Sequence, residues 1–308
     1  MTNQKRWKGF LWILPSLFGT LIFYCVPLMD VIRRSVTENA GSAFVGLKNF
    51  QTVFENTAFQ LAAQNTLRFI AVCIPLLLSL SLLLAVVIMR CRWGNFYKSA
   101  MLLPMALPAV SAALLWKLLF HNHGVLNVWS TSAQQMLDAG RAIVRRTILH
   151  GTAFEKVLTL LGFQTTDWLN SGASFWVLVL SYLWRNIGYD MVLWIAGLQQ
   201  IENDIYEAAR VDGAGEIRIF FWIILPNMKQ VFYTVAVLSL LNSFKVFREA
   251  YLVAGNYPHE SMYLMQHLFN NWFAALSLDK MSAASVLLGM VILLMIILLH
   301  RAWGNDLC

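Results

Sequence analysis

The chain has 308 residues, of which 58% are hydrophobic and only 13% are charged. A soluble fold of this length would leave too much apolar surface in water, so the composition excludes a soluble globular domain and indicates an integral membrane protein. The net charge of +7 is scattered between apolar segments. That distribution suits loops beside anionic lipid headgroups and predicts no nucleic-acid-binding face.

Six predominantly apolar runs approach the length of about 20 residues that a membrane-spanning helix needs. They cover residues 10–29, 69–89, 99–116, 173–198, 231–254 and 281–299. Pro104 and Pro108 predict a kink in the third run. The sequence therefore predicts an all-α polytopic membrane protein with six transmembrane helices. We expect one domain over residues 1–308, with the first span and an external loop in 1–65 and a five-span core in 66–302.

The charges between the runs predict the orientation of the chain. Lys5, Arg6 and Lys8 precede the first run, which lacks a small-residue cleavage site at its end and is therefore a membrane helix rather than a cleaved signal. Residues 90–98 form a short loop with three cations, which places it in the cytoplasm. An even number of spans then puts both termini in the cytoplasm.

The longer polar connections are expected outside the membrane, at residues 30–64, 121–172 and 255–280. Each is expected to contain some helix, the third around residues 264–269. His259 and His267 in the third connection have no carboxylate or cysteine at metal-ligand spacing, so both are expected to be loop residues.

The four cysteines do not indicate a disulfide framework or a zinc site. Cys25 and Cys73 lie in apolar runs, Cys91 lies in the basic loop and Cys308 is the last residue. No pair has CxxC spacing. We expect them to act as small hydrophobic residues, and we expect no metal site.

A compact polar stretch between the fourth and fifth runs begins with Glu207-Ala208-Ala209. Alanine favours a helix, and its small side chain lets another surface approach closely. Gly213 permits a sharp turn, and Pro226 suits the first turn of the next membrane helix. The stretch therefore predicts a helix, a turn and a second helix on the cytoplasmic surface. An ordinary surface loop is the alternative.

The spacing Glu-Ala-Ala, three residues, Gly, nine residues, Ile-x-Leu-Pro resembles the signature of the membrane subunits of binding-protein-dependent ABC importers. Leu14-Pro15, residues 44–50, Asn65-Thr66 and residues 196–199 resemble the carbohydrate-type permeases of that family. The likeness covers nearly the whole chain. Two external features depart from the pattern: residues 121–172 are longer than usual, and Gly255-Asn256-Tyr257-Pro258 replaces an expected Gly-Gly-Pro.

The resemblance implies a permease subunit in a bacterial inner membrane that imports a carbohydrate delivered by an external binding protein. Its partners would be a cytoplasmic ABC ATPase dimer, which holds ATP and Mg, and a second, related permease. This chain has no phosphate-binding loop and is expected to hold no cofactor. The residues implied to couple transport to the ATPase are Glu207, Ala208, Ala209, Asp212, Gly213, Ile223, Leu225 and Pro226.

Polar residues inside the fourth and fifth runs are candidates for substrate contact, because a charge at the membrane centre is unfavourable by ~2.5–3.5 kcal/mol or more and faces the bundle interior. The candidates are Trp184, Arg185, Asn186, Tyr189, Asn242, Lys245 and Glu249. The structural alternative is that Arg185 forms a hydrogen bond or ion pair between helices. Lys245 and Glu249, spaced i, i+4, are expected to pair with each other.

The sequence leaves other functions open. The cations Arg185, Lys245 and Arg248 would suit a sugar phosphate or glycerol phosphate, and a polyol is a further alternative. An intramembrane enzyme would need an activated nucleophile, paired carboxylates or a metal motif. In the sequence, Cys73 has no polar neighbour and Asp190 has no second aspartate nearby. A scaffold role fits poorly with buried polar residues. We therefore expect a transporter subunit with no catalytic residue.

Overall fold

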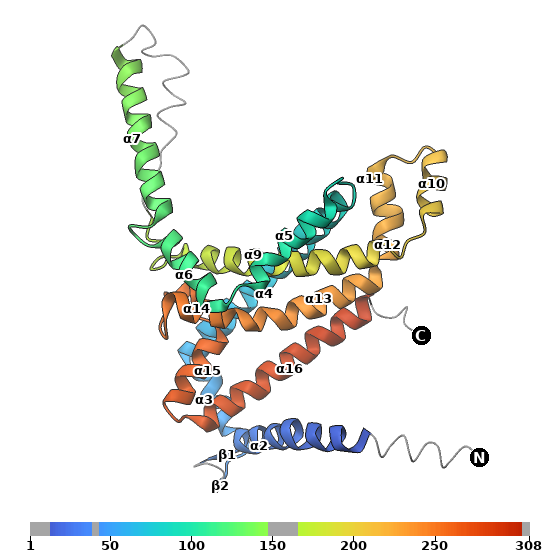
Figure 1. Ribbon diagram of the computed structural model, residues 1–308. Helices are drawn as coiled ribbons and strands as arrows, with labels where there is room; N and C mark the ends of the chain where they lie inside the picture. The colour runs from blue at the N-terminus through green and yellow to red at the C-terminus, as the bar shows by residue number, and fades with distance from the viewer. Residues whose placement is uncertain (1–12, 39–42, 147–165, 304–308) are drawn as a thin grey trace, which may run out of the picture. The chain divides into compact units, whose positions relative to one another are not determined.

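A computed structural model describes residues 13–38, 43–146 and 166–303, and these are almost entirely helical (Figure 1). The chain divides into two compact units. One comprises Met1–Ala62 with Leu268–Leu298, and the other comprises Ala63–His267 with Leu299–Cys308. The predicted all-α class is confirmed.

The first unit begins with a helix over Ile13–Ser35, which includes a π-helical turn η1 (Leu21–Cys25) and α2 (Val26–Ser35). The predicted span ended at residue 29. The helix continues because Arg34 pairs with Asp30 one turn earlier, at 2.7 Å, which keeps both charges satisfied on its surface. The strands β1 (Thr37–Glu38) and β2 (Ala43–Phe44) then pair antiparallel.

The helix α3 (Lys48–Glu55) folds back onto the end of this first helix. Its Asn49 is buried, and the Asn49 Nδ2 donates to the carbonyl oxygens of Thr37 at 2.8 Å and Ser35 at 3.2 Å. With a longer hydrogen bond to the carbonyl of Arg34 at 3.4 Å, this buried amide fixes the connection between α2 and α3. The predicted external loop is therefore largely ordered.

The other helices follow in chain order. They are α4 (Thr57–Met89), α5 (Gly94–Ala106), α6 (Ala109–Phe120), α7 (Val125–Arg146), α9 (Ser174–Leu198), α10 (Asn203–Val211), α11 (Glu216–Ile219), η3 (Phe220–Ile224), α12 (Leu225–Asn227), α13 (Lys229–Ser243), η4 (Phe244–Val246), α14 (Phe247–Ala254), η5 (Glu260–Met262), α15 (Met265–Ala274) and α16 (Leu278–Trp303). The second span begins at Thr57 rather than at the predicted residue 69, and α5 takes in half of the predicted basic loop.

Four helices in the described part of the chain are long and apolar enough to cross a membrane, namely Ile13–Ser35, α4, the continuous segment Lys229–Ala254 and α16. A fifth span results if α5 and the helical segment Ala109–Ala139, which takes in α6 and part of α7, are counted as one span that is bent by 92°. The bend lies at Leu107-Pro108, where a proline prevents the helix from continuing, so the predicted kink is confirmed. The predicted count of six requires α9, a helix of 25 residues whose polar side chains lower its hydropathy.

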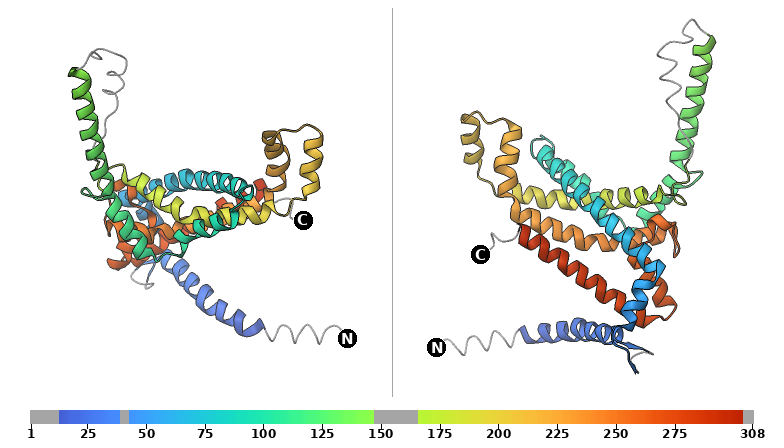
Figure 2. Two further views of the ribbon diagram at one scale, coloured as in Figure 1. Left: turned by 45° about the horizontal axis from the view of Figure 1, so that its top comes forward. Right: turned by 180° about the vertical axis from the view of Figure 1, so that it is seen from behind.

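In the second unit, α9 packs against α5 and α13 (Figures 1 and 2). The approach of α5 is closest at Gly188, where a Cβ atom would collide with the backbone carbonyl of Met101. Small residues allow membrane helices to pack backbone to backbone in this way. A buried apolar cluster joins α4 to α9 through residues such as Phe69, Leu77 and Leu178.

Asn65 and Thr66, near the start of the second unit, hold the connection after α14. The Asn65 Nδ2 donates to the backbone carbonyls of Glu260 and Tyr263, and the Thr66 Oγ1 accepts from the backbone N–H of Met265 at 3.0 Å. These three hydrogen bonds satisfy backbone groups that would otherwise be buried without a partner. The Asn-Thr pair therefore positions the segment that leads into α15.

His267 lies in the third polar connection and in the helix expected around residues 264–269, but the sequence did not indicate that it is buried. It lies in α15, is 1% exposed, and its ring packs against Phe247 and Tyr263. Its Nδ1 accepts from the backbone N–H of Leu264 at 3.2 Å, which places the neutral ring at the start of the helix. Burial lowers the pKa of His267 to about 4. Tertiary packing produced this environment, since no neighbour in sequence indicates it.

Candidate functional site

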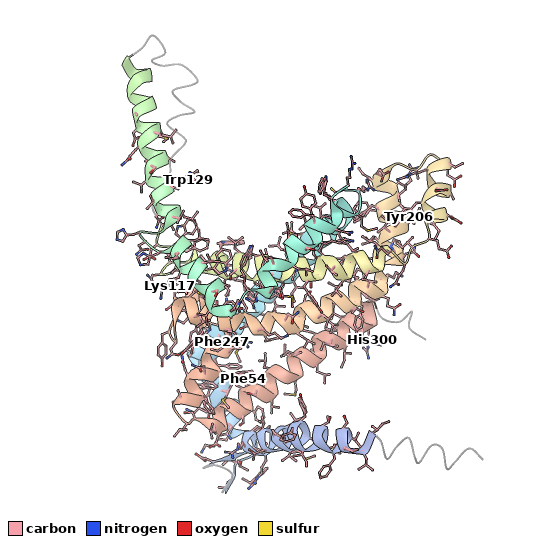
Figure 3. All side chains as sticks on the ribbon, in the orientation of Figure 1. Phe54, Lys117, Trp129, Tyr206, Phe247 and His300 are labelled. Atoms are coloured by element: carbon pink, nitrogen blue, oxygen red, sulfur yellow. The ribbon has the colours of Figure 1, made fainter. Side chains whose placement is uncertain are left out.

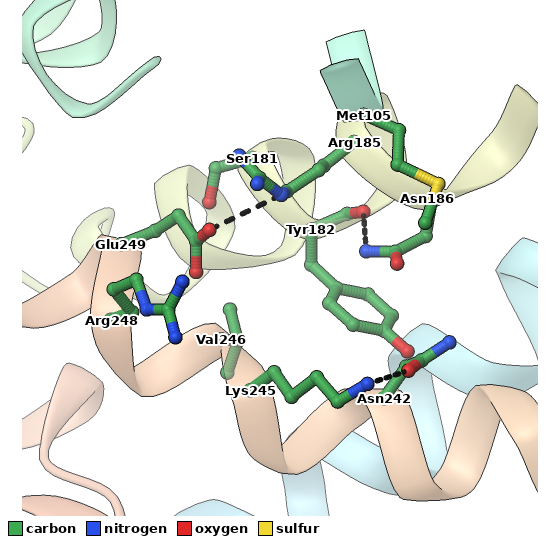
Figure 4. A pocket seen from close by; sticks show the side chains of 10 residues that line it. All are labelled: Met105, Ser181, Tyr182, Arg185, Asn186, Asn242, Lys245, Val246, Arg248 and Glu249. Carbon is green, nitrogen blue, oxygen red and sulfur yellow. Dashed lines mark hydrogen bonds and ion pairs between the residues drawn. The ribbon is translucent and has the colours of Figure 1, made fainter. Parts of the chain in front are cut away.

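A polar pocket lies inside the second unit between α9 and the segment from the end of α13 through η4 to α14, with one residue from α5 (Figure 4). Its volume is about 170 Å³, and it is lined by Met105, Ser181, Tyr182, Arg185, Asn186, Asn242, Lys245, Val246, Arg248 and Glu249. The α9 residues come in two i, i+4 pairs, so one face of this helix carries them all. Five of the seven predicted substrate residues are brought together here.

Arg185 forms an ion pair with Glu249, with 3.3 Å between the Arg185 Nε and the Glu249 Oε1. The side chains are 22% and 10% exposed, so the pair joins α9 to α14 in a largely dry environment. The Arg185 Nη1 is buried and has no hydrogen-bond partner among the described residues. The interhelix ion pair that was the structural alternative for Arg185 is therefore present, but it leaves one donor of the guanidinium unused.

The expected pairing of Lys245 with Glu249 is wrong. The Lys245 Nζ instead donates to the Asn242 Oδ1 at 2.8 Å (Figure 4). The reason is the 3₁₀ segment η4, which includes Lys245 and changes the helical register, so that residues four apart no longer share a face. Asn242, another predicted substrate residue, is the residue that holds Lys245 in place.

Trp184 and Tyr189, the other two predicted substrate residues, do not line the pocket. The ring of Trp184 packs edge to face on Trp116 of α6, with 5.3 Å between the ring centroids. Tyr189 is half-buried on α9. The sequence could not separate these aromatic residues from the pocket-lining ones, because all lie within two turns of one helix.

A buried hydrogen-bond network beneath the pocket ties α9 to α13. The Tyr182 hydroxyl donates to the backbone carbonyl of Ser239 at 2.8 Å, and the Ser239 Oγ donates to the Asp190 Oδ2 at 2.6 Å. Asp190 is fully buried. Hydrogen bonds between helices fix relative position in a bilayer, where no water competes for the groups. Asp190 is therefore a structural residue beneath the site.

The charge of the pocket is positive. Arg185, Lys245 and Arg248 line it against the single carboxylate of Glu249. Glu249 forms an ion pair with Arg185 and also interacts electrostatically with Arg248, so three cations share one carboxylate in the lining, and Lys245 and Arg248 are exposed. Such a site attracts a ligand that carries negative charge or many oxygen acceptors.

A second feature is the helix-turn-helix formed by α10, α11 and η3, which confirms the predicted shape of the Glu207 stretch. The α10 helix ends in a Schellman motif: the backbone N–H of Ala214 donates to the carbonyl of Ala209, and that of Gly213 to the carbonyl of Arg210. Gly213 has a φ of +77°, a conformation that glycine adopts without strain. Pro226 lies in the first turn of α12, as predicted.

The predicted coupling residues divide between the surface and the interior. Ala209 is 9% exposed and packs inward on a cluster with Met228, while Ile223 and Leu225 are half-buried. Tyr206 also points inward from α10 (Figure 3). Within this chain Ala209 therefore packs toward the interior. The exposed members are Glu207, Ala208, Asp212, Gly213 and Pro226.

An ion-pair cluster that the sequence did not indicate joins this loop to the end of α4. Glu216 accepts from Arg90 at 2.5 Å and from Arg210 at 3.2 Å. The Arg90 guanidinium, followed by Arg210, holds the pKa of the Glu216 carboxyl below its usual range. Exposed pairs contribute little energy each, but two arginines on one carboxylate set the direction of the loop.

The described residues contain no group of histidine, cysteine and carboxylate side chains that could hold a metal ion, and Cys25, Cys73 and Cys91 are free. Cys308 lies outside the described residues.

Comparison with known proteins identifies the family. The family model described as "Binding-protein-dependent transport system inner membrane component" matches residues 78–303. The chain belongs to this family. It is therefore an inner-membrane subunit of a transport system and not an enzyme, which confirms the predicted class and removes the intramembrane-enzyme alternative.

Two relatives match almost the whole length of this permease. It is 29% identical over 294 residues to the sn-glycerol-3-phosphate transport system permease protein UgpA of Yersinia pseudotuberculosis, covering 93% of this chain and 91% of the relative. It is 27% identical over 306 residues to the probable ABC transporter permease protein YurN of Bacillus subtilis, covering 96% and 94%.

A solved structure shares the fold. The crystal structure of a bacterial ABC transporter involved in the import of the acidic polysaccharide alginate contains a chain that matches the permease with a TM-score of 0.78. The match covers 98% of this chain and 96% of the other, at 19% identity. The helical arrangement is therefore that of an ABC importer permease.

Proposed function

We propose that this permease imports a carbohydrate or a carbohydrate derivative, delivered by an external binding protein and driven by ATP hydrolysis on a separate ATPase dimer that holds ATP and Mg. A second, related permease completes the membrane pore. The chain forms one transmembrane domain of six spans, α9 included, with both termini in the cytoplasm. The glycerol-phosphate and polysaccharide systems among its relatives support this substrate class.

The observation that carries the proposal is the polar pocket within the spans. Charged and amide side chains inside a membrane bundle are unfavourable unless they pair or serve a ligand. Here Asn186, Asn242 and Lys245 present hydrogen-bonding groups to one cavity beside the Arg185–Glu249 pair. Sugars are recognised by such clustered donors and acceptors, so the pocket suits a stage of substrate passage.

The test is uptake by the complete importer reconstituted in liposomes. We expect Asn242→Ala to lower substrate uptake several-fold at an unchanged amount of assembled complex, because it removes a pocket amide and releases Lys245. Lys117→Ala, an exposed change on α6 outside the pocket, is the control and should transport normally. Equal uptake by both variants would refute the assignment of the pocket.

Among carbohydrate derivatives, the lining favours one with an acidic group such as a phosphate or a uronate. The cations Lys245 and Arg248 lie in the pocket beyond the single carboxylate, which already pairs with Arg185. Neutral sugars and polyols gain less from such a field. In the double variant Lys245→Gln with Arg248→Gln, a sugar phosphate should compete less well with the substrate for uptake. The neutral sugar should compete as well as it does in the parent. Equal loss for both ligands would contradict an acidic substrate.

We propose that the loop from α10 to α12 transmits ATPase motion to the spans. Val211 is 87% exposed and Ile217 is 78% exposed on this loop, beside Glu207 and Ala208. Exposed apolar side chains on a polar loop outside the spans suit a protein partner. Glu207→Lys should uncouple ATP hydrolysis from uptake, whereas Glu202→Lys, just before α10, should not. Coupled transport by the Glu207 variant would overturn the assignment.

A further inference from the structure

The helix α7 (Val125–Arg146) differs from the other long helices of the second unit because it runs across the direction of α9 rather than along it (Figures 1 and 2). It leaves the bundle beside the N-terminal end of α9, the end remote from α10. If α10 faces the cytoplasm, as proposed above, α7 lies at the outer surface. Because α9 spans the membrane, a helix that runs across the direction of α9 at its outer end lies along the plane of the membrane.

The base of α7 is fixed by one buried amide, that of Asn127, which is 4% exposed. Its Nδ2 donates to the carbonyl of Thr166 at 2.9 Å and of Asn122 at 3.1 Å. Its Oδ1 accepts from the backbone N–H of Thr166 and from the indole N–H of Trp168, each at 3.2 Å. These four hydrogen bonds and a longer one, from the Asn127 Nδ2 to the carbonyl of His121 at 3.4 Å, fix the direction in which α7 leaves the bundle.

One face of α7 is apolar and exposed. Val125 is 61% exposed, Val128 58% and Met136 76%, and the indole of Trp129 is 62% exposed (Figure 3). At about 100° per residue these four side chains fall within an arc of about 100°, which is the width of the apolar stripe of an amphipathic helix. The stripe faces away from the packed base.

The opposite side of α7 is polar, and its end is basic. Gln134 and Asp138 lie on the far side of the helix and are hydrogen-bonded to each other. Three of the last six residues of α7, 141–146, are arginines. An apolar stripe with a tryptophan, a polar opposite face and a basic end is the pattern of helices that lie in the membrane interface.

We propose that α7 lies in the outer headgroup layer of the membrane, with the stripe of Val125, Val128, Trp129 and Met136 inserted among the lipid chains. The occupant of the stripe is lipid.

The test compares two labelled positions on opposite sides of α7. Met136→Cys and Asp138→Cys lie about 200° apart around the helix. Each is labelled with an environment-sensitive dye in the complete importer, with the native cysteines replaced, in nanodiscs that contain anionic lipid and spin-labelled lipid. We expect lipid quenching to reduce the fluorescence at residue 136 roughly twofold, with little loss at residue 138, because only the stripe is inserted.

Further outcomes decide the proposal. Replacing the anionic lipid with a zwitterionic one should lessen the quenching at residue 136, and Asn127→Ala should abolish the difference between the two positions. Equal quenching at both positions, or none at either, would overturn it. A label at residue 136 that is shielded from lipid and cross-links to the second permease or the binding protein would show a protein occupant instead. Uptake, measured on the same samples, tests the proposed function separately from the lipid contact.

Discussion

Removal of the Glu249 carboxylate is the sharpest test of how the pocket is held together. Glu249→Gln keeps the shape of the side chain but leaves Arg185, which is 22% exposed, without its counter-charge. Breaking a buried ion pair from one side destabilises a protein by about 3–5 kcal/mol. Since the pocket gives water some access to Arg185, we expect the lower end of that range, about 3 kcal/mol.

The assay is thermal unfolding of the purified importer in detergent. At roughly 2–4 °C per kcal/mol, the Glu249→Gln variant should unfold about 6–12 °C below the parent. Lys245→Gln is the matched control, because Lys245 lines the same pocket but is exposed and makes only a side-chain hydrogen bond to Asn242. The Lys245→Gln change should lower the free energy of unfolding by only about 0–1 kcal/mol. Equal shifts for the two variants would refute the view that the ion pair joins α9 to α14.

A double replacement separates the structural role of the pair from substrate contact. With both charges removed, as in Arg185→Met combined with Glu249→Leu, no unpaired charge stays buried, and the stability should return close to that of the parent. Uptake should nevertheless stay low if the unused donor of Arg185 serves the substrate. Recovery of both stability and uptake would show that the pair is purely structural.

Three further predictions follow from particular residues. Gly188→Ala forces a Cβ against a backbone carbonyl of α5 and should lower the free energy of unfolding by about 1–3 kcal/mol in the same thermal assay, whereas Gly289→Ala, which meets no atom within 4 Å, should not. Gly213→Ala strains the φ of +77° by about 1 kcal/mol, so hydrogen exchange at the end of α10 should accelerate, but not in Gly215→Ala. Burial lowers the pKa of His267 to about 4, so between pH 6.5 and 4 the unfolded chain binds more protons than the folded chain. The free energy of unfolding should therefore fall by roughly 3 kcal/mol as the pH drops from 6.5 to 4. His267→Asn should flatten this pH dependence.

Local sequence determined the elements and the class of this protein. The apolar runs predicted the spans, since a helix in lipid satisfies its own backbone and needs only length and hydropathy. The Glu-Ala-Ala to Gly213 spacing predicted a helix and a turn, because alanine propensity and the φ of glycine act within a few residues. The prolines at 104 and 108 predicted a bend for the same reason, although not its angle of 92°.

Only the tertiary structure decided which polar residues act together. Helical spacing predicted that Lys245 would pair with Glu249, but the 3₁₀ segment that includes Lys245 alters the register. Glu249 of α14 pairs with Arg185 of α9 instead. Packing likewise turned Ala209 inward. A side chain's partner depends on how separate helices are placed against each other, and that placement is set by contacts between residues far apart in the chain. The hydropathy and residue spacing of one segment do not predict those contacts.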